Sequence, residues 1–224
     1  MIKPPYLKAG DKVGIVSTAR KITLKELQPA INCISSWGLD VVLGDNLFKE
    51  DHQFAGTDEE RAEDLQFMLD DPEVKAVICA RGGYGTVRII DRIDFTKFQQ
   101  SPKWICGYSD VTVLHSHLNR HFKTQTIHSM MPVNFKGVAC DSGAANSLKN
   151  ALFGKEMEYE FPTHEFNRNG EAVGQIVGGN LSMLYSLLGS PSDVETDGKI
   201  LFLEDLDEYL YHVDRMMMNL KRNG

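Results

Sequence analysis

Residues 74–85 read Val-Lys-Ala-Val-Ile-Cys-Ala-Arg-Gly-Gly-Tyr-Gly, an apolar run that leads directly into a glycine-rich loop. Such a run is typical of a buried β-strand. Similar short apolar runs occur at residues 13–16, 41–43 and 104–106, and segments with helical spacing of apolar residues separate them. Strands that alternate with helices predict an α/β fold with a parallel sheet and helices on both of its faces.

Two capping boxes mark the starts of helices in this part of the chain. Thr23 is followed three residues later by Glu26, and Thr57 is followed three residues later by Glu60. In a capping box the two side chains bond to each other's backbone N–H groups, which stabilises the first helical turn. We therefore expect helices to begin at these two points, between successive strands.

The alternating pattern dissolves from about residue 154 to residue 170, where polar and aromatic residues surround a proline. We interpret this stretch as a linker. It divides the chain into an N-terminal α/β domain (1–153), the linker (154–170) and the start of a C-terminal domain (171–224). The last part has only two predicted strands and two predicted helices, too few to build a core of its own. We expect three of its apolar side chains to lack part of their cover: Ile176, Leu201 and Leu203.

Composition excludes several classes of protein. Of the 224 residues 42% are hydrophobic and 25% charged, which is typical of a globular chain. The net charge of −7 disfavours binding to the phosphate backbone of a nucleic acid, so we expect no nucleic-acid partner. No apolar run reaches the roughly 18 residues that span a bilayer, and the N-terminus lacks the features of a signal peptide. The four scattered cysteines indicate reduced thiols, so we expect a cytoplasmic protein without a membrane partner.

Ser109 lies in Cys106-Gly-Tyr-Ser-Asp110, between a predicted strand and a predicted helix. A serine at a sharp strand-to-helix turn projects out of the sheet, and the next backbone N–H is well placed to stabilise an oxyanion. The motif lacks the second glycine of the full Gly-x-Ser-x-Gly elbow. Capping of the helix by Ser109 or Asp110 is the structural alternative.

The glycine-rich loop after residue 80 can bring its backbone close to a ligand, because Gly82, Gly83 and Gly85 have no Cβ atom. The spacing matches neither a dinucleotide fingerprint nor a phosphate loop, so a tight turn is the alternative. In an open α/β sheet the loops at the carboxyl ends of strands line the ligand crevice, which places this loop beside Ser109. Arg81 could then bind a carboxylate with its bidentate guanidinium.

Two motifs of the C-terminal part also merit a functional interpretation. Gly178-Gly179-Asn180 precedes a helix, and capping explains Asn180 but leaves the double glycine unexplained. Glu204 is the first residue of an acidic cluster directly after a predicted strand. Most such clusters are solvated helix starts whose negative charges interact favourably with the helix dipole. Because Glu204 lies nearest the strand end, it is the best candidate to orient a histidine.

The histidines give no strong signal of a metal site. His117 and His121 share one helix face, but the metalloprotease signature His-Glu-x-x-His is missing and acidic ligands are lacking nearby. His128 follows a predicted strand and is either a loop residue or a pocket wall. We therefore predict neither a metal nor an organic cofactor.

Taken together, Arg81-Gly-Gly-Tyr-Gly, Gly-Tyr-Ser109-Asp, Gly-Gly-Asn180-Leu and Leu-Phe-Leu-Glu204-Asp resemble the LD-carboxypeptidase family in order and spacing. These are cytoplasmic serine peptidases that recycle murein peptides, and the family includes the microcin-immunity peptidases. The resemblance implies an N-terminal parallel α/β sheet that carries the nucleophile and a smaller β-rich C-terminal domain, incomplete here. It also implies a homodimer that uses no metal or organic cofactor.

Carried over residue by residue, the resemblance makes Ser109 the nucleophile and Glu204 the triad acid. It makes the backbone amides of Gly83 and Asp110 the oxyanion hole. The implied substrate is a murein tetrapeptide, cut before its terminal D-alanine. We expect four residues to contact this substrate: Arg81, Gly82, Tyr84 and Asn180.

The sequence departs from the family pattern in one respect. The triad histidine of the family lies in a Gly-His motif well after the glutamate, and no Gly-His pair occurs here. His212 lies in the helix directly after the acid, which is a different context. We therefore expect the chain to be a fragment of a longer enzyme and to be close to inactive by itself.

Two other functions remain open at this stage. One is an immunity peptidase that cleaves aminoacyl-nucleotide antibiotics, which the specificity loops do not exclude. The other is a non-catalytic module that keeps the cleft and binds ligand but lacks the base.

Overall fold

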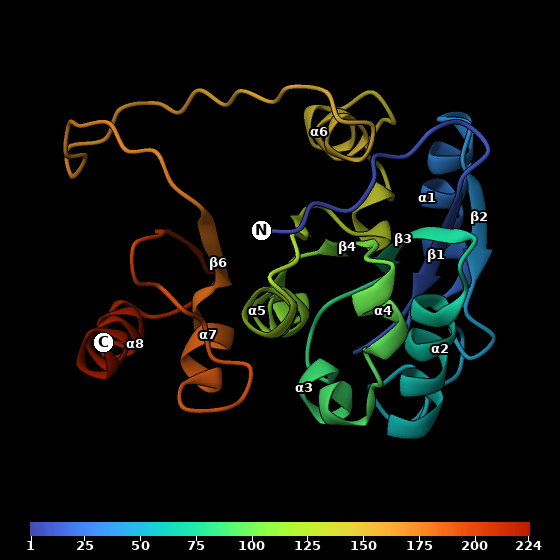
Figure 1. Cartoon of the computed structure of the whole chain (residues 1–224), viewed down its shortest axis with the longest axis horizontal. Coiled ribbons are helices and arrows are strands. Elements are labelled where there is room, and N and C mark those ends of the chain that lie inside the picture. The colour runs from blue at the N-terminus through green and yellow to red at the C-terminus, as the bar shows by residue number, and fades with distance from the viewer.

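The computed structural model describes residues 1–224 and contains two separate parallel sheets (Figure 1). The larger sheet has the order β2-β1-β3-β4-β5 and every neighbouring pair in it is parallel. Its strands are β1 (Lys12–Val16), β2 (Asp40–Leu43), β3 (Val74–Cys79), β4 (Trp104–Gly107) and β5 (Ile127–His128). The smaller sheet pairs β6 (Ile176–Asn180) with β7 (Ile200–Glu204). The predicted α/β architecture, with a small second sheet, is confirmed.

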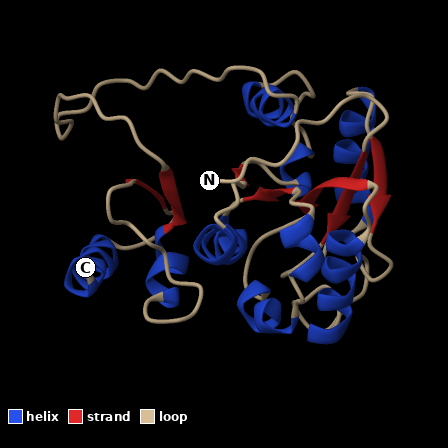
Figure 2. Cartoon of the chain, in the orientation of Figure 1, coloured by secondary structure: helices blue, strands red, loops and turns tan.

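Helices cover both faces of the larger sheet (Figure 2). The α-helices are α1 (Leu24–Ser36), α2 (Asp58–Asp70), α3 (Thr86–Ile89), α4 (Thr96–Gln100), α5 (Thr112–Phe122), α6 (Gly143–Leu152), α7 (Leu181–Leu187) and α8 (Leu210–Asn223). Three short 3₁₀ helices occupy Ile90–Arg92, Ser109–Val111 and Pro132–Phe135. Helices α1 and α6 pack on one face, whereas α2 to α5 pack on the other. No helix combines the length and apolar character that a bilayer crossing requires.

The larger sheet has a hydrophobic core on each face, and successive side chains of a strand belong to opposite cores. Ala76 and Ile78 of β3 join the core under α1 and α6, and Val77 and Cys79 join the opposite core. Successive side chains of a strand point to opposite faces, so a parallel strand buried on both faces is apolar throughout. This is the physical reason for the uninterrupted apolar run in the sequence.

Both predicted capping boxes are present at the starts of α1 and α2, with Thr23 and Thr57 as N-caps. Helices α4 and α6 were not predicted. The five residues of α4 are too few for an apolar period to be visible, and α6 begins in a small-residue segment at Gly143. The glycines at 178 and 179 belong to β6 rather than to a loop before the next helix.

A disulfide joins Cys33 of α1 to Cys140, 107 residues further along the chain. The expectation of four reduced thiols is therefore wrong for this pair, while Cys79 and Cys106 are free and buried. Only the packing of α1 against the segment before α6 brings the two sulfur atoms together, and no spacing rule reveals this. The cysteines consequently no longer support a cytoplasmic location.

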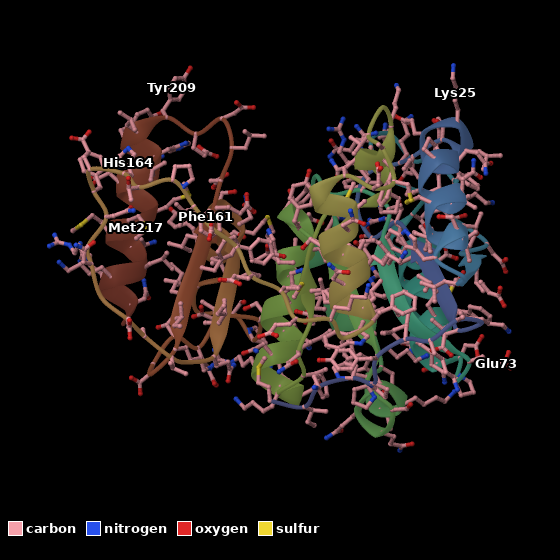
Figure 3. All side chains as sticks on the ribbon, turned by 90° about the horizontal axis from the view of Figure 1, so that it is seen from above. Lys25, Glu73, Phe161, His164, Tyr209 and Met217 are labelled. Carbon is pink, nitrogen blue, oxygen red and sulfur yellow. A yellow bond between two sulfur atoms is a disulfide. The ribbon has the colours of Figure 1, made fainter.

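Residues 155–175 contain no helix or strand and cross from α6 to β6 as an extended loop (Figure 2). Beyond it, Leu187 of α7 packs into the same core as α5, which attaches the smaller sheet to the larger domain. Ile176 keeps 64% of its surface exposed and Leu201 keeps 37%. Tyr209 extends outward from the start of α8 (Figure 3). The predicted lack of cover is thus confirmed for Ile176 and Leu201, whereas Leu203 is half-buried.

Candidate active site

Three loops meet at the carboxyl edge of the larger sheet. They follow β1, β3 and β4, which are adjacent strands in the order of the sheet. Because parallel strands present all their carboxyl ends at one edge, the residues after Val16, Cys79 and Gly107 lie together at that edge. The predicted meeting of the glycine-rich loop with Ser109 is therefore present in the fold.

Ser109 occupies the turn between β4 and the helical segment that continues into α5. Its φ angle is +60°, in the left-handed region that a side chain rarely adopts. Such a conformation costs about 1–3 kcal/mol and is held only where the surrounding structure imposes it. A serine on a strained strand-to-helix turn is the arrangement of a nucleophile elbow.

Gly82 and Gly83 allow the loop after β3 to approach this serine closely. A Cβ atom added at Gly82 would lie 3.2 Å from Oγ of Ser109 and 3.3 Å from Cε of Met131. Gly83 has a φ of +116°, and its backbone N–H donates no hydrogen bond within the chain. The loop therefore packs against Ser109 through Gly82, and the next residue carries an amide donor that the chain does not use.

Asp110 fastens the serine turn to the same loop. Its side chain is buried, and Oδ2 accepts a hydrogen bond of 2.8 Å from the backbone N–H of Thr86, the first residue of α3. Burial raises the pKa of Asp110, and its Oδ1 atom has no hydrogen-bond partner. The side chain thus has a structural role, and the expected oxyanion role of the Asp110 backbone N–H stays a prediction.

Glu204 is the last residue of β7, opposite Asn180 in the register of the small sheet. Its Oε1 atom lies 3.9 Å from Nε2 of His128 and makes no hydrogen bond. Burial raises the pKa of Glu204, and burial lowers the pKa of His128. The acid expected to orient a histidine therefore faces one, although a different histidine from the one the resemblance implies.

His128 was expected to be either a loop residue or a pocket wall, and it lines the cavity beside β6. Its ring lies 6.1 Å from that of Tyr108, the residue before Ser109, and 5.2 Å from that of Phe202 on β7. The pairing of β5 with β4 places His128 opposite Gly107. A histidine at the end of a strand was the only signal available, and the partner strand could not be inferred from it.

His115 of α5 contacts the end of β4, directly before the turn that carries Ser109. Its Nε2 lies 2.9 Å from the carbonyl oxygen of Gly107, so Nε2 carries the proton that is donated there. Nδ1 is buried without a partner. Burial lowers the pKa of His115 to about 4, so the ring is neutral at pH 7. No histidine forms a hydrogen bond with the hydroxyl of Ser109.

The double glycine before Asn180 has a packing explanation. A Cβ atom at Gly178 would lie 1.9 Å from the carbonyl oxygen of Phe202, and one at Gly179 would lie 2.6 Å from Oγ1 of Thr112. Asn180 caps α7 through the backbone N–H of Met183. These residues hold β6 against its neighbours, and the predicted contact of Asn180 with substrate stays a prediction.

Arg81 is paired within the protein. Its Nη1 lies 3.6 Å from Oε1 of Glu26 and 3.4 Å from the carbonyl oxygen of Lys21. Tyr84 is 47% exposed, and its ring packs 6.0 Å from that of Phe54. The expected substrate contacts of Arg81 and Tyr84 stay predictions.

The remaining histidines of interest bind to other parts of the chain. Nδ1 of His117 lies 2.9 Å from Oγ of Ser192, and Nε2 of His121 lies 2.6 Å from the carbonyl oxygen of Pro191. The two rings thus tie α5 to the segment after α7. His212 of α8 pairs with Glu208, which lies just before that helix, rather than with Glu204.

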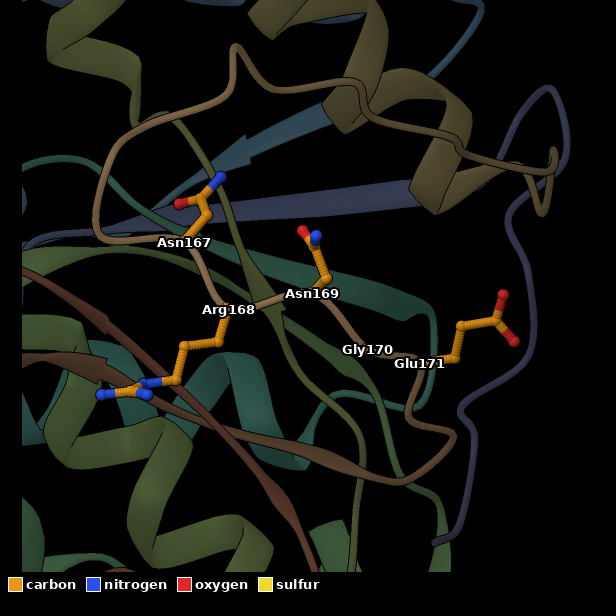
Figure 4. A pocket seen from close by; sticks show the side chains of 5 residues that line it. All are labelled: Asn167, Arg168, Asn169, Gly170 and Glu171. Carbon is orange, nitrogen blue, oxygen red and sulfur yellow. The ribbon is translucent and has the colours of Figure 1, made fainter.

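One hollow lies beside the smaller sheet and another lies in the extended loop. A cavity of about 520 Å³ lies between α5 and β6 and is lined by His115, His128 and Phe202 among others, but not by Ser109. The second hollow lies in the extended loop and is lined by residues 167–171, none of which is hydrophobic (Figure 4). There Arg168 and Glu171 point in opposite directions, so no set of polar groups converges on a ligand.

Comparison with known families and proteins agrees with this geometry. The N-terminal domain of LD-carboxypeptidases matches residues 13–129, and the C-terminal domain of the same family matches residues 173–224. The chain is 40% identical over 227 residues to a probable murein peptide carboxypeptidase of Bacillus subtilis. That match covers 99% of this chain and 70% of the Bacillus protein.

Solved structures give the same result. A muramoyltetrapeptide carboxypeptidase from Oxalobacter formigenes superposes with a TM-score of 0.87 at 30% identity, over 95% of this chain and 72% of that one. The fold is also shared with MccF in complex with glutamyl sulfamoyl guanosine, at a TM-score of 0.84 and 21% identity, over 98% of this chain and 76% of that one. Since the matched regions make up most of its length, this chain belongs to the LD-carboxypeptidase family.

Proposed function

We propose that this chain carries the nucleophile and the triad acid of a serine-type LD-carboxypeptidase. The substrate is a murein tetrapeptide, from which the enzyme releases the terminal D-alanine in cell-wall recycling. The observation that carries the proposal is the left-handed backbone of Ser109, placed directly against the Gly82–Gly83 loop. The relatives that are named as murein peptide carboxypeptidases supply the substrate class.

In the proposed reaction Oγ of Ser109 attacks the carbonyl carbon before the terminal D-alanine. The proton of the hydroxyl passes to a histidine, because a serine hydroxyl is a weak nucleophile until a base removes its proton. The N–H groups of Gly83 and Asp110 donate to the oxyanion that forms. The peptide C–N bond then breaks, the histidine returns the proton to the leaving amine of D-alanine, and water hydrolyses the acyl-enzyme.

Glu204 is the acid that orients the histidine in this proposal. Its partially buried carboxylate would stabilise a charged imidazolium far better than a fully hydrated one could. His128 is the histidine that contacts it here, whereas the resemblance assigns the base to a Gly-His motif that this sequence does not contain. The proposal therefore predicts little turnover by the 224 residues alone.

The test compares D-alanine release from a murein tetrapeptide by three proteins. They are the 224-residue chain, the chain fused to the C-terminal remainder of the Bacillus subtilis relative, and this fusion with Ser109→Ala. We expect turnover only by the fusion with serine, since loss of a triad nucleophile costs several orders of magnitude in kcat. Full activity of the Ser109→Ala fusion would contradict the proposal. Comparable turnover by the unfused chain would instead make His128 the first histidine to replace.

The alternative substrate class is an aminoacyl-nucleotide antibiotic. The fold shared with MccF, whose structure holds glutamyl sulfamoyl guanosine, is the observation in its favour. Assay of the same fusion on an acyl-sulfamoyl adenylate separates the two classes. Preferential cleavage of the adenylate would replace the murein proposal while leaving the role of Ser109 unchanged.

A further inference from the structure

Besides Arg81, a second arginine packs against the glycine-rich loop that lies beside Ser109. The sequence patterns gave no indication of it. Arg20 follows β1, and its stem lies across Gly83: a Cβ atom on that glycine would lie 2.3 Å from Cδ of Arg20. The neighbouring Gly82 is the residue whose added Cβ would meet Oγ of Ser109. The Cα atoms of consecutive residues are about 3.8 Å apart, so the stem of Arg20 and the nucleophile contact one short stretch of backbone.

The backbone of Arg20 is fixed while its side chain is free. Its carbonyl oxygen accepts a hydrogen bond from Oγ of Ser17, and its backbone pairs with Phe54 in an antiparallel bridge. The side chain is exposed, and its guanidinium forms no ion pair or hydrogen bond within the chain. A charged group that is held at its base and unpaired at its tip is available to a ligand.

The other arginines near this loop, and the adjacent Lys21, are engaged in ion pairs. Arg81 pairs with Glu26, and Lys21 pairs with Glu50 at 2.6 Å. Arg61 and Arg88 both pair with Asp58. Arg20 is therefore the arginine beside the glycine-rich loop whose guanidinium has no partner within the chain.

The chemistry of the proposed reaction needs such a group near the nucleophile. In a peptide that loses its last residue, one residue separates the scissile carbonyl from the terminal carboxylate, a span of at most about 3.6 Å. A guanidinium matches a carboxylate through two parallel N–H···O bonds. Gly83 would then have two uses, because its missing side chain lets Arg20 cross the loop and its N–H is the proposed donor to the oxyanion.

We propose that Arg20 binds the terminal carboxylate of the substrate and thereby confines cleavage to the last peptide bond. This inference rests on the proposed carboxypeptidase function and assigns to Arg20 the role that sequence spacing assigned to Arg81. Arg81 would then serve mainly to hold α1 through Glu26.

The test measures equilibrium binding by calorimetry in the Ser109→Ala form of the fusion protein described above, here called the parent, so that no turnover is needed. The two probes are a murein tetrapeptide that ends in D-alanine and the same peptide with a C-terminal amide. Hydrogen bonds to a charged group are worth enough that we expect the parent to bind the acid at least about tenfold more tightly than the amide. Arg20→Gln should abolish this preference and Arg20→Lys should keep part of it. Lys21→Gln removes a neighbouring exposed charge and should leave the preference unchanged.

The outcomes separate this inference from the function beneath it. If Arg20→Gln retains the tenfold preference, or if Arg81→Gln removes it and Arg20→Gln does not, the assignment to Arg20 is wrong and the carboxypeptidase proposal stands. If the parent binds neither peptide, the proposed substrate class falls and the inference falls with it. Loss of the preference in Arg20→Gln, with amide binding unchanged, supports the inference because a folding defect would weaken both probes.

Discussion

Replacement of His115 should make the protein less sensitive to acid. The ring is 6% exposed, its Nε2 donates to the carbonyl oxygen of Gly107, and its Nδ1 has no partner. Burial is the main cause that lowers its pKa from 6.5 to about 4, and the nearby ring of His128 adds a smaller effect in the same direction. In the unfolded chain the ring takes up a proton near pH 6.5, whereas in the folded chain it stays neutral until about pH 4.

The sign and size of the effect follow from these two pKa values. A group whose pKa is lower in the folded state contributes its full stability above the unfolded pKa, and this contribution is lost as the pH falls toward the folded pKa. A tenfold difference in proton affinity between the folded and unfolded states is worth about 1.4 kcal/mol, so His115 should cost the folded state about 2.5 kcal/mol between pH 7.5 and pH 4.5. His115→Asn should not show this part of the loss.

Urea unfolding of the parent chain and of His115→Asn at both pH values measures this difference. The parent should lose about 2.5 kcal/mol more free energy of unfolding than the variant on acidification. Comparing the two losses cancels the contributions of His117, of the carboxylates and of the substitution itself. His52→Asn, which replaces an exposed histidine, should lose as much stability as the parent. Equal losses in the parent and His115→Asn would refute the reasoning, because the buried ring would then be protonated equally in both states.

Three further substitutions test the packing of the site and of the fold. Gly82→Ala should lower kcat/KM of the fusion enzyme by up to about a hundredfold with little change in melting temperature. The reason is that its Cβ would lie 3.2 Å from Oγ of Ser109 and displace it. Unchanged kinetics would show that the hydroxyl has room to move. Gly178→Ala should lower the free energy of unfolding by at least about 1–3 kcal/mol, because the new Cβ would lie 1.9 Å from a carbonyl oxygen of β7; a stable variant in urea titration would contradict the tight pairing of the small sheet. Cys33→Ser should lower the free energy of unfolding by about 2–4 kcal/mol, because it removes the disulfide to Cys140. Thiol titration of the unfolded parent should find two free thiols. Four free thiols would show that the bond is absent.

Local patterns in the sequence determined the architecture of the large domain. The apolar run before Arg81 predicted a strand buried on both faces, because a strand between two helical layers has no polar face. Thr23 and Thr57 located two helix starts, since a capping box involves only residues three apart. The position of Ser109 after a strand predicted its turn, and the parallel topology placed that turn beside the glycine loop.

Contacts between distant segments were decided only by the tertiary structure. Cys33 and Cys140 are 107 residues apart, and nothing in their spacing pairs them. His128 meets Glu204 because β5 lies at the edge of the sheet that faces the smaller sheet, a neighbourhood that no periodicity encodes.

Arg20 and Arg81 show the same distinction within the site. Sequence spacing favoured Arg81, which lies in the glycine-rich motif, over Arg20, which lies 61 residues before it. The fold ties Arg81 to Glu26 and lays the free Arg20 across Gly83. Short-range rules describe a residue by its neighbours in the chain, whereas availability for a ligand depends on which charges the folded chain has already paired.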